Sequence, residues 1–318
     1  MTVRLPSPAA PLKIGTRGSP LALAQAHETR QRLGTAFDLP DAAFEIVVIK
    51  VQGDDRSMIA ADRPLKEIGN KGLFTREIED ALLEGGIDIA VHSMKDMPTV
   101  QPDGLVLDTY LPREDVRDAF VSPRFKTIAD LPAGATVGSS SLRRRAQLLH
   151  RRPDLNVAEF RGNVQTRLKK LGDGVADCTF LACAGLNRLN MTDVPATPVD
   201  PTDMLPAIAQ GAIGIERRVS DTNTADLLAA IHDAPTGHRL AAERHFLFTL
   251  DGSCETPIAG LATLDGATLT LVGEVLRPDG SNAISGTRTG AIADGTAMGA
   301  DLAQDLLKTA GPGFFDWH

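Results

Sequence analysis

The sequence has 318 residues, a formal net charge of −8 and a hydrophobic content of 42%, which is enough chain for two or three domains with apolar cores. Aromatic residues make up only 4% of it, and few aromatics in an acidic chain argue against a nucleic-acid-binding protein. No apolar run approaches the roughly 20 residues that a membrane-spanning helix needs, and residues 1–11 lack the apolar core of a signal peptide. We therefore expect a cytoplasmic protein that does not enter the membrane.

The first hundred residues alternate between predicted strands and predicted helices. Ser19 is a predicted helix cap with Pro20 in the first turn. The stretch 52–72 is long, polar and weakly periodic, and connections of this length are uncommon unless they are functional or mobile, so we expect a flap over the site. The pattern predicts a helix from residue 20, a second helix over 74–83, and strands over 13–16, 44–51 and 87–91.

A second series of the same kind follows an irregular stretch. The periodic pattern is lost over residues 98–123, so we expect the chain to cross there into a second lobe. Residues 192–206, rich in Pro, Thr and Asp, are the expected return crossing, followed by a return segment over 208–217. The alternation predicts a parallel sheet, with strands over 136–138, 156–160 and 178–182 and helices over 142–151 and 164–171.

The pattern changes after residue 235, where antiparallel strands are expected. It predicts a helix over 238–250, strands over 258–264, 267–276 and 283–290, and a closing helix over 298–307. We therefore predict an α/β fold of two lobes with mixed or parallel sheets plus a small α+β C-terminal domain. The expected boundaries are residues 1–110 with 207–230 for the first lobe, 111–206 for the second lobe and 231–318 for the third domain.

A strand that ends in polar residues is the first candidate site. Ser93, Lys95 and Asp96 follow the apolar run 87–91, and Pro98 stops the strand because it has no N–H to donate. Open α/β sheets bind ligands at the carboxyl ends of their strands, where a lysine beside an aspartate could hold an anion and move a proton. The alternative is that Lys95 and Asp96 are ordinary solvated turn residues.

Three strand-to-helix junctions share a hydroxyl or amide cap and arginine. They are residues 16–20 (TRGSP), 138–145 (GSSSLRRR) and 160–163 (FRGN), the last followed by Arg167. A helix N-terminus attracts anions, and arginine binds carboxylates in a bidentate way. Three such junctions indicate a site for a small ligand with several carboxylates. The alternatives are ordinary caps with exposed arginines, and a nucleic-acid site, which the acidic chain disfavours.

The three cysteines fall into two classes. Cys178 and Cys183 lie in an apolar segment, and we expect them to be buried. Cys254 lies in the loop 250–257 and is either a reactive thiol or an ordinary surface cysteine. We expect His92 to be a core histidine, and no metal site, because no Cys/His spacing typical of metal binding occurs.

Taken together, these motifs resemble those of the porphobilinogen deaminase (hydroxymethylbilane synthase) family. The resemblance runs in order from Thr16 to Gly260 through TRGSPLALAQA, NKGLFTREIE, DIAVHSMKDMP, REDVRDAF, GSSSLRRRAQL, RRPDL, RGNVQTRL, LACAGLNRL, AIAQGAIGIE and DGSCETPIAG. It implies two lobes similar to periplasmic binding proteins and a small third domain. It also implies a monomeric transferase of porphyrin and heme biosynthesis, which joins four porphobilinogen molecules head to tail with loss of ammonia and releases hydroxymethylbilane by hydrolysis.

The resemblance also assigns roles to individual residues. It implies a dipyrromethane cofactor attached by a thioether to Cys254, and a catalytic carboxylate at Asp96. The residues that it implies for cofactor binding are Lys95, Ser141, Arg143, Arg144, Arg161, Arg167 and Arg188. Those that it implies for substrate binding are Arg17, Ser19 and Lys71. Glu67 departs from the pattern, since some relatives carry lysine there, so Lys66 receives no role.

The main alternative is a non-catalytic two-lobe protein that binds an anionic small molecule. It accounts for the lobes and the arginines but not for the loop of Cys254 or the third domain. Such a binder would also usually carry an export signal, which the first residues lack.

Overall fold

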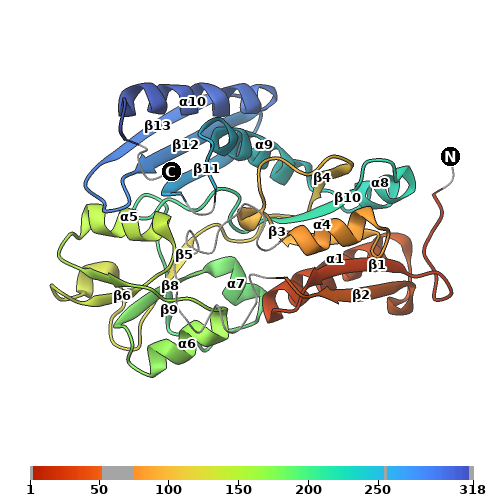
Figure 1. Cartoon of the computed structure of the whole chain (residues 1–318), viewed down its shortest axis with the longest axis horizontal. Helices are drawn as coiled ribbons and strands as arrows, with labels where there is room; N and C mark the ends of the chain where they lie inside the picture. The colour runs from red at the N-terminus through yellow and green to blue at the C-terminus, as the bar shows by residue number, and fades with distance from the viewer. Residues whose placement is uncertain (1–2, 52–74, 254–255, 315–318) are drawn as a thin grey trace. The chain divides into compact units, whose positions relative to one another are not determined.

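The computed structural model describes residues 3–51, 75–253 and 256–314, which divide into two compact units (Figure 1). The first unit contains residues 3–51, 75–114 and 212–237, and the second contains 115–211, 238–253 and 256–314. The second unit carries two separate sheets. The boundaries expected for three domains stay a prediction, and the expected flap over 52–72 lies outside the described residues.

The first unit is built around a mixed five-stranded sheet in the order β2-β1-β3-β10-β4. Strand β1 pairs in parallel with β2 and β3, whereas β10 is antiparallel to both β3 and β4. The strands are β1 (Leu12–Arg17), β2 (Phe44–Ile49), β3 (Ile89–Ser93), β4 (Leu105–Tyr110) and β10 (Ile213–Arg218). The helices are α1 (Pro20–Phe37), α4 (Arg76–Leu83) and α8 (Thr222–Ala229), with short 3-10 turns η1 (Asp41–Ala43) and η3 (Met94–Asp96).

The central strand β3 is buried because helices cover both faces of this sheet. Ile89 and Val91 belong to the apolar cluster that includes Leu33 of α1. Ala90 points to the other face and belongs to the cluster that includes Ile78 of α4. Side chains alternate between the faces of a strand, so one face of β3 meets α1 and the other meets α4.

The second unit repeats this pairing pattern in the sheet β7-β6-β8-β5-β9. Strand β6 is parallel to β7 and β8, and β5 is antiparallel to β8 and β9. The elements are β5 (Asp118–Val121), η4 (Ile128–Asp130), β6 (Thr136–Gly138), α5 (Leu142–Arg151), β7 (Asn156–Ala158), α6 (Val164–Gly172), β8 (Cys178–Ala182), α7 (Cys183–Arg188) and β9 (Ala196–Pro198).

Each crossing of the chain ends in an antiparallel strand of the sheet that it enters. Strand β5 is the first strand after the chain passes residue 114, and β10 is the first after it passes residue 211. The prediction of a parallel sheet for the second series was therefore incomplete, because β5 and β9 were not predicted and both pair in antiparallel fashion.

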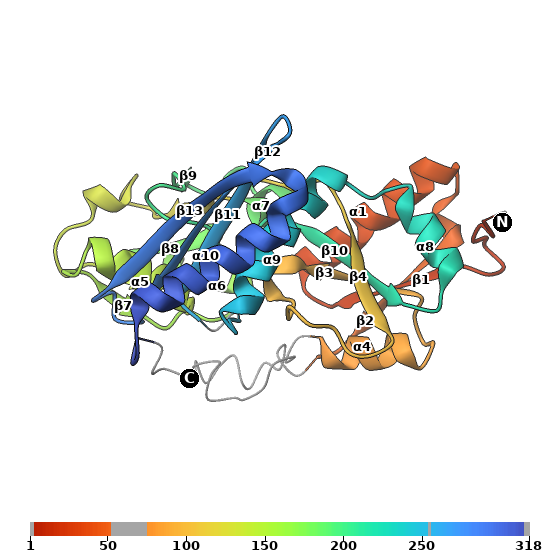
Figure 2. The same cartoon turned by 90° about the horizontal axis from the view of Figure 1, so that it is seen from above.

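A three-stranded antiparallel sheet completes the second unit. It consists of β11 (Ile258–Asp265), β12 (Thr268–Leu276) and β13 (Ala283–Ala291), and it comes with α9 (Ala234–Thr249), η5 (Ile292–Asp294) and α10 (Gly295–Ala310). Helix α10 packs along β12 and β13 (Figure 2). Gly273 of β12 allows both helices to pack closely, since a Cβ there would lie 2.5 Å from the ring of Phe246 on α9 and 3.0 Å from Leu302 on α10. The expected small α+β domain is confirmed, and with it the fold of two α/β lobes and a C-terminal domain.

Candidate functional site

A pocket of the first unit lies at the carboxyl ends of the parallel strands β1 and β3. The two helices nearest to it, α1 and α4, cover opposite faces of the sheet. Such a change of side between neighbouring parallel strands is where open α/β sheets bind their ligands. The pocket is lined by Arg17, Ser19, Leu21, Ala22, Gln25, Thr75, Val91, His92, Ser93, Asp96 and Met97.

The N-terminus of α1 gives the pocket a positive wall. Ser19 caps the helix, with its Oγ accepting a hydrogen bond of 3.2 Å from the backbone N–H of Ala22, and Pro20 lies in the first turn. The first turn carries no acidic residue, so the partial positive charge of the helix end is not neutralised there. Arg17, the last residue of β1, also lines the pocket. The two described residues expected to bind substrate therefore lie together.

The turn after β3 brings Asp96 to the same pocket. The backbone N–H of Met94 donates to the carbonyl of Ala212 over 3.0 Å, which fixes the start of η3. Ser93 Oγ lies 2.8 Å from Nε2 and 3.1 Å from Oε1 of Gln25, so β3 and α1 are joined at the pocket. Lys95 lies in η3 beside Asp96 but is not among the lining residues. Lys71 lies outside the described residues.

His92 contributes a buried polar pair to the same pocket. Its Nε2 lies 3.1 Å from Oε2 of Glu216 on β10, and the two side chains are 5% and 0% exposed. The expectation of a core histidine is confirmed, although His92 also lines the pocket. Glu79 of α4 is close by: burial, and then the charge of Glu216, raises the pKa of the Glu79 carboxyl.

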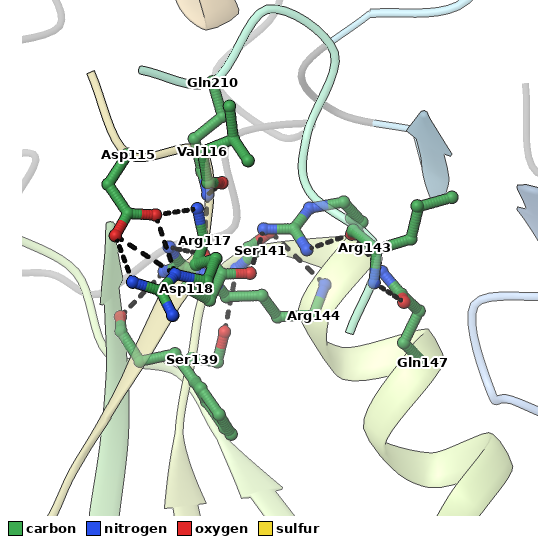
Figure 3. A network of polar contacts seen from close by, with 12 residues as sticks. Asp115, Val116, Arg117, Asp118, Ser139, Ser141, Arg143, Arg144, Gln147 and Gln210 are labelled. Carbon is green, nitrogen blue, oxygen red and sulfur yellow. Dashed lines mark hydrogen bonds and ion pairs between the residues drawn. The ribbon is translucent and has the colours of Figure 1, made fainter. Parts of the chain in front are cut away.

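In the second unit, Asp118 holds two of the arginines expected to bind cofactor (Figure 3). Asp118 Oδ2 accepts from Nη2 of Arg143 over 2.7 Å, and Oδ1 accepts from Nη2 and Nε of Arg144 over 2.7 and 3.2 Å. Gln210 Nε2 donates to the same Oδ1 over 3.0 Å. Burial alone would raise the pKa of Asp118, but the charges of both arginines and the hydrogen bonds of Arg144 and Gln210 outweigh it and hold the pKa below its ordinary range.

Among the hydrogen-bonded groups of this cluster, positive charges outnumber negative ones, and the nearby buried carboxyl of Glu274 has its pKa raised by burial. Arg143 and Arg144 contribute two guanidinium groups against one carboxylate, and their remaining contacts in it are neutral carbonyls, of Leu205 and Phe180. Nε of Arg143 is buried and has no hydrogen-bond acceptor among the described residues. Burial of a net charge is costly unless it is paired, so the cluster fits an anionic group such as a cofactor carboxylate.

The other predicted junctions are also helix N-termini with basic residues. Ser141 Oγ accepts from the N–H of Arg144 over 3.4 Å at α5, and Asn163 Oδ1 accepts from the N–H of Thr166 over 2.9 Å at α6. Neither helix has an acidic residue in its first turn. The remaining arginines of the prediction are Arg161, which is buried, Arg167, whose Nε donates to Gly162, and Arg188, whose Nη2 donates to Gly211.

The cysteines divide as expected where they are described. Cys178 and Cys183 are buried, and burial raises the pKa of the first thiol to about 12 and of the second to about 11. Neither is poised to react at neutral pH. Cys254 lies outside the described residues.

Sequence reasoning missed Gln25, Asp118, Gln210 and Glu216. Asp118 stood in a charged stretch without periodicity, where it was indistinguishable from a surface residue. Glu216 is separated from His92 by 124 positions, and no local pattern marks a contact over that distance.

Comparison with known proteins decides the family. Residues 12–226 match the family model described as "Porphobilinogen deaminase, dipyromethane cofactor binding domain", and residues 238–308 match "Porphobilinogen deaminase, C-terminal domain". The chain belongs to the porphobilinogen deaminase family. It is also 66% identical over 314 residues to porphobilinogen deaminase of Paracoccus denitrificans (strain Pd 1222), covering 99% of both chains.

Solved structures with a similar arrangement include periplasmic binding proteins. A periplasmic substrate-binding protein from Coxiella burnetii is 14% identical with a TM-score of 0.41, and 73% of this chain and 96% of that chain are covered. The periplasmic aliphatic sulphonate binding protein of Escherichia coli is 15% identical with a TM-score of 0.40, and the coverage is 76% and 70%.

Membership of the porphobilinogen deaminase family makes the chain a transferase of porphyrin and heme biosynthesis with a dipyrromethane cofactor. The arginines expected to bind that cofactor lie in the first matched region, and Cys254 lies in the second. Within the described residues, no helix is both long and apolar enough to cross a membrane.

Proposed function

We propose that the chain joins four porphobilinogen molecules head to tail on a dipyrromethane primer held by a thioether to Cys254. Each addition releases ammonia, and hydrolysis finally frees hydroxymethylbilane. The observation that carries the proposal is the pocket in which Arg17, Ser19 and Asp96 lie together in a member of the deaminase family. It offers both a place for carboxylates and a carboxylate of its own.

Arg17 and the N-terminus of α1 bind the carboxylates of the incoming porphobilinogen. The guanidinium group gives charge-assisted, bidentate hydrogen bonds, and the cap at Ser19 leaves the other N–H groups of the first turn directed at the ligand. Lys71 is proposed as a further substrate-binding cation from the family resemblance alone.

Asp96 is the proposed catalytic carboxylate. Loss of ammonia and formation of the new carbon–carbon bond both place positive charge on a pyrrole nitrogen. A carboxylate fixed in η3 at the pocket wall stabilises that charge and accepts and returns protons. The Asp96 carboxylate is already in position where the positive charge develops. It therefore stabilises the transition state more than the bound substrate, which lowers the activation barrier.

The cofactor carboxylates are proposed to bind to Lys95, Ser141, Arg143, Arg144, Arg161, Arg167 and Arg188. The excess positive charge around Asp118 and the buried Nε of Arg143 support this assignment. When bound, dipyrromethane supplies the free pyrrole carbon to which the first unit is added, and its attachment keeps the growing end of the chain at the site for every later addition. The protein's part is to offset the carboxylates that accumulate as the chain grows.

We also propose that the protein works as a monomer in the cytoplasm and binds neither nucleic acid nor membranes. The acidic charge and the low aromatic content support this. The alternative of a non-catalytic binder of an anionic solute is disfavoured by the second matched region, which such a binder would not need.

Intact mass spectrometry combined with a turnover assay tests the proposal. Purified protein should be heavier than its sequence by one dipyrromethane, and the excess should vanish in Cys254→Ala but persist in the control Cys183→Ala. Active protein of unmodified mass would overturn the tether. Protein that carries the cofactor but does not consume porphobilinogen would overturn the reaction.

A further inference from the structure

Behind the wall of the pocket, three titratable side chains share one buried space. His92 of β3 and Glu216 of β10 lie 3.1 Å apart and are almost fully buried. Glu79 of α4 is 8% exposed, and its electrostatic partners include both of them. Together they place two acids and one base on the face of the sheet that α4 covers.

Among the described residues, this cluster lacks one of the hydrogen bonds that an ordinary buried ion pair would make. Oε1 of Glu216 is buried and has no hydrogen-bond partner among the described residues. Burial, and then the charge of Glu216, raises the pKa of Glu79. Two buried carboxylates beside a neutral imidazole would leave an excess negative charge, which is costly. The group as a whole therefore favours holding an exchangeable proton.

The cluster also reaches the pocket. His92 is one of its lining residues, together with Arg17 of β1 and Asp96 of η3. Because Nε2 of His92 lies against Glu216, the neutral imidazole carries its proton on Nε2, and Nδ1 is left as the acceptor. Within the described residues, Glu216 is the hydrogen-bond partner that the structure gives to His92.

We propose that His92 is a second acid–base group of this pocket beside Asp96, and that Glu216 is the residue that positions it. The proposal rests on the condensation proposed above. It divides the chemistry between two groups: Asp96 stabilises positive charge on the pyrrole nitrogen, and His92 carries the proton that must leave carbon.

The proton balance of one condensation requires a base, and this is the role that we assign to His92. The carbon–nitrogen bond of the protonated aminomethyl group of porphobilinogen breaks, and ammonia leaves with the bonding electron pair. The pyrrole at the growing end then uses a π electron pair to form the new carbon–carbon bond, and its α-carbon loses a proton. Nδ1 of His92 accepts this proton, so that the ring becomes an imidazolium beside Glu216, and the ring then passes the proton to the released ammonia, which departs as ammonium. No oxidant or reductant is needed.

The pH dependence of kcat in Glu216→Gln distinguishes this role from a structural one. The glutamine keeps a hydrogen-bond partner for His92 but removes the charge that favours the imidazolium. We expect the acid limb of the kcat profile to move to lower pH and kcat at the plateau to fall about tenfold, with KM and the cofactor mass unchanged. Glu274→Gln is the control, because it removes another buried carboxyl, on β12, and should leave the acid limb in place.

A measurement on the unaltered protein covers the case in which variants fold poorly. With imidazole nitrogens labelled by ¹⁵N, neutral His92 should carry its proton on Nε2, the nitrogen that lies against Glu216. A proton fixed on Nδ1, or a folded and loaded Glu216→Gln enzyme with an unchanged pH profile, would overturn the proposal. If the parent protein itself does not consume porphobilinogen, the proposed function fails instead.

Discussion

Nη2 of Arg144 and Oδ1 of Asp118 lie 2.7 Å apart in a site where their side chains are 5% and 0% exposed. Arg143 reaches the other oxygen of the same carboxylate. An acidic chain thus keeps one aspartate in its interior to hold two arginines in fixed positions. The arginines are oriented before any ligand carboxylate arrives, so little side-chain entropy is lost when one binds.

Replacing Asp118 by asparagine should destabilise the protein strongly. The change leaves two buried guanidinium groups without their anion, and breaking a buried pair in this way typically costs about 3–5 kcal/mol. The midpoint of urea denaturation measures the loss. Asp115→Asn is the matched control, because Asp115 pairs with the half-exposed Arg117 and exposed pairs contribute about 1 kcal/mol or less. Equal losses in the two variants would contradict the role given to Asp118.

Asp118 should also shape stability at acid pH. Its folded pKa lies below the unfolded value of about 3.9, so its contribution is complete above that value and is lost as the pH falls through the folded pKa. The free energy of unfolding of the parent should therefore fall from about pH 5 downward. The fall should be shallower in Asp118→Asn, measured by denaturation at a series of pH values. Parallel curves for the two proteins would show that another group controls acid stability.

Asp96→Asn should keep the fold and the cofactor mass but lose most of the turnover. Removing one preorganised electrostatic group from an active site commonly lowers kcat by about 10²-fold or more. Steady-state consumption of porphobilinogen gives the number, and Asp103→Asn, at an exposed turn, is the control. Near-normal turnover in Asp96→Asn would remove Asp96 from the mechanism.

Arg17→Gln should weaken porphobilinogen binding. Hydrogen bonds to charged groups contribute about 1.5–3 kcal/mol, so KM should rise about tenfold or more while the denaturation midpoint changes little. Arg32→Gln is the control, because Arg32 lies on α1 and pairs with Glu28 of the same helix. An unchanged KM in Arg17→Gln would show that the carboxylates of the substrate bind elsewhere.

Elements with local signals were predicted well from sequence. The bounds of β6, α5 and β8 agree with the prediction, since β6 and β8 are short apolar runs and α5 begins at the cap Ser141. Strand β5 was missed because it has four residues and begins with the charged Asp118. A buried charge looks like a surface charge until its partners, Arg143 and Arg144, are brought to it by folding.

In the candidate site, too, residues with local sequence signals were predicted, and residues defined by long-range contacts were missed. Arg17, Ser19 and Asp96 were predicted from strand ends and a helix cap, which are local features, and all three line the pocket. Gln25 and Glu216 were not predicted, because their roles depend on contacts made across the sheet. The arginines near helix starts were expected to bind an external anion, whereas Asp118 supplies an anion to two of them from within the chain.

The most direct test of the account is the mass of the protein during the reaction. Protein given less than four equivalents of porphobilinogen should show a ladder of masses, each step adding one porphobilinogen less ammonia. The ladder should start from the cofactor-bearing mass and be absent in Cys254→Ala. Formation of hydroxymethylbilane by protein whose mass never changes would contradict growth of the product on an anchored primer.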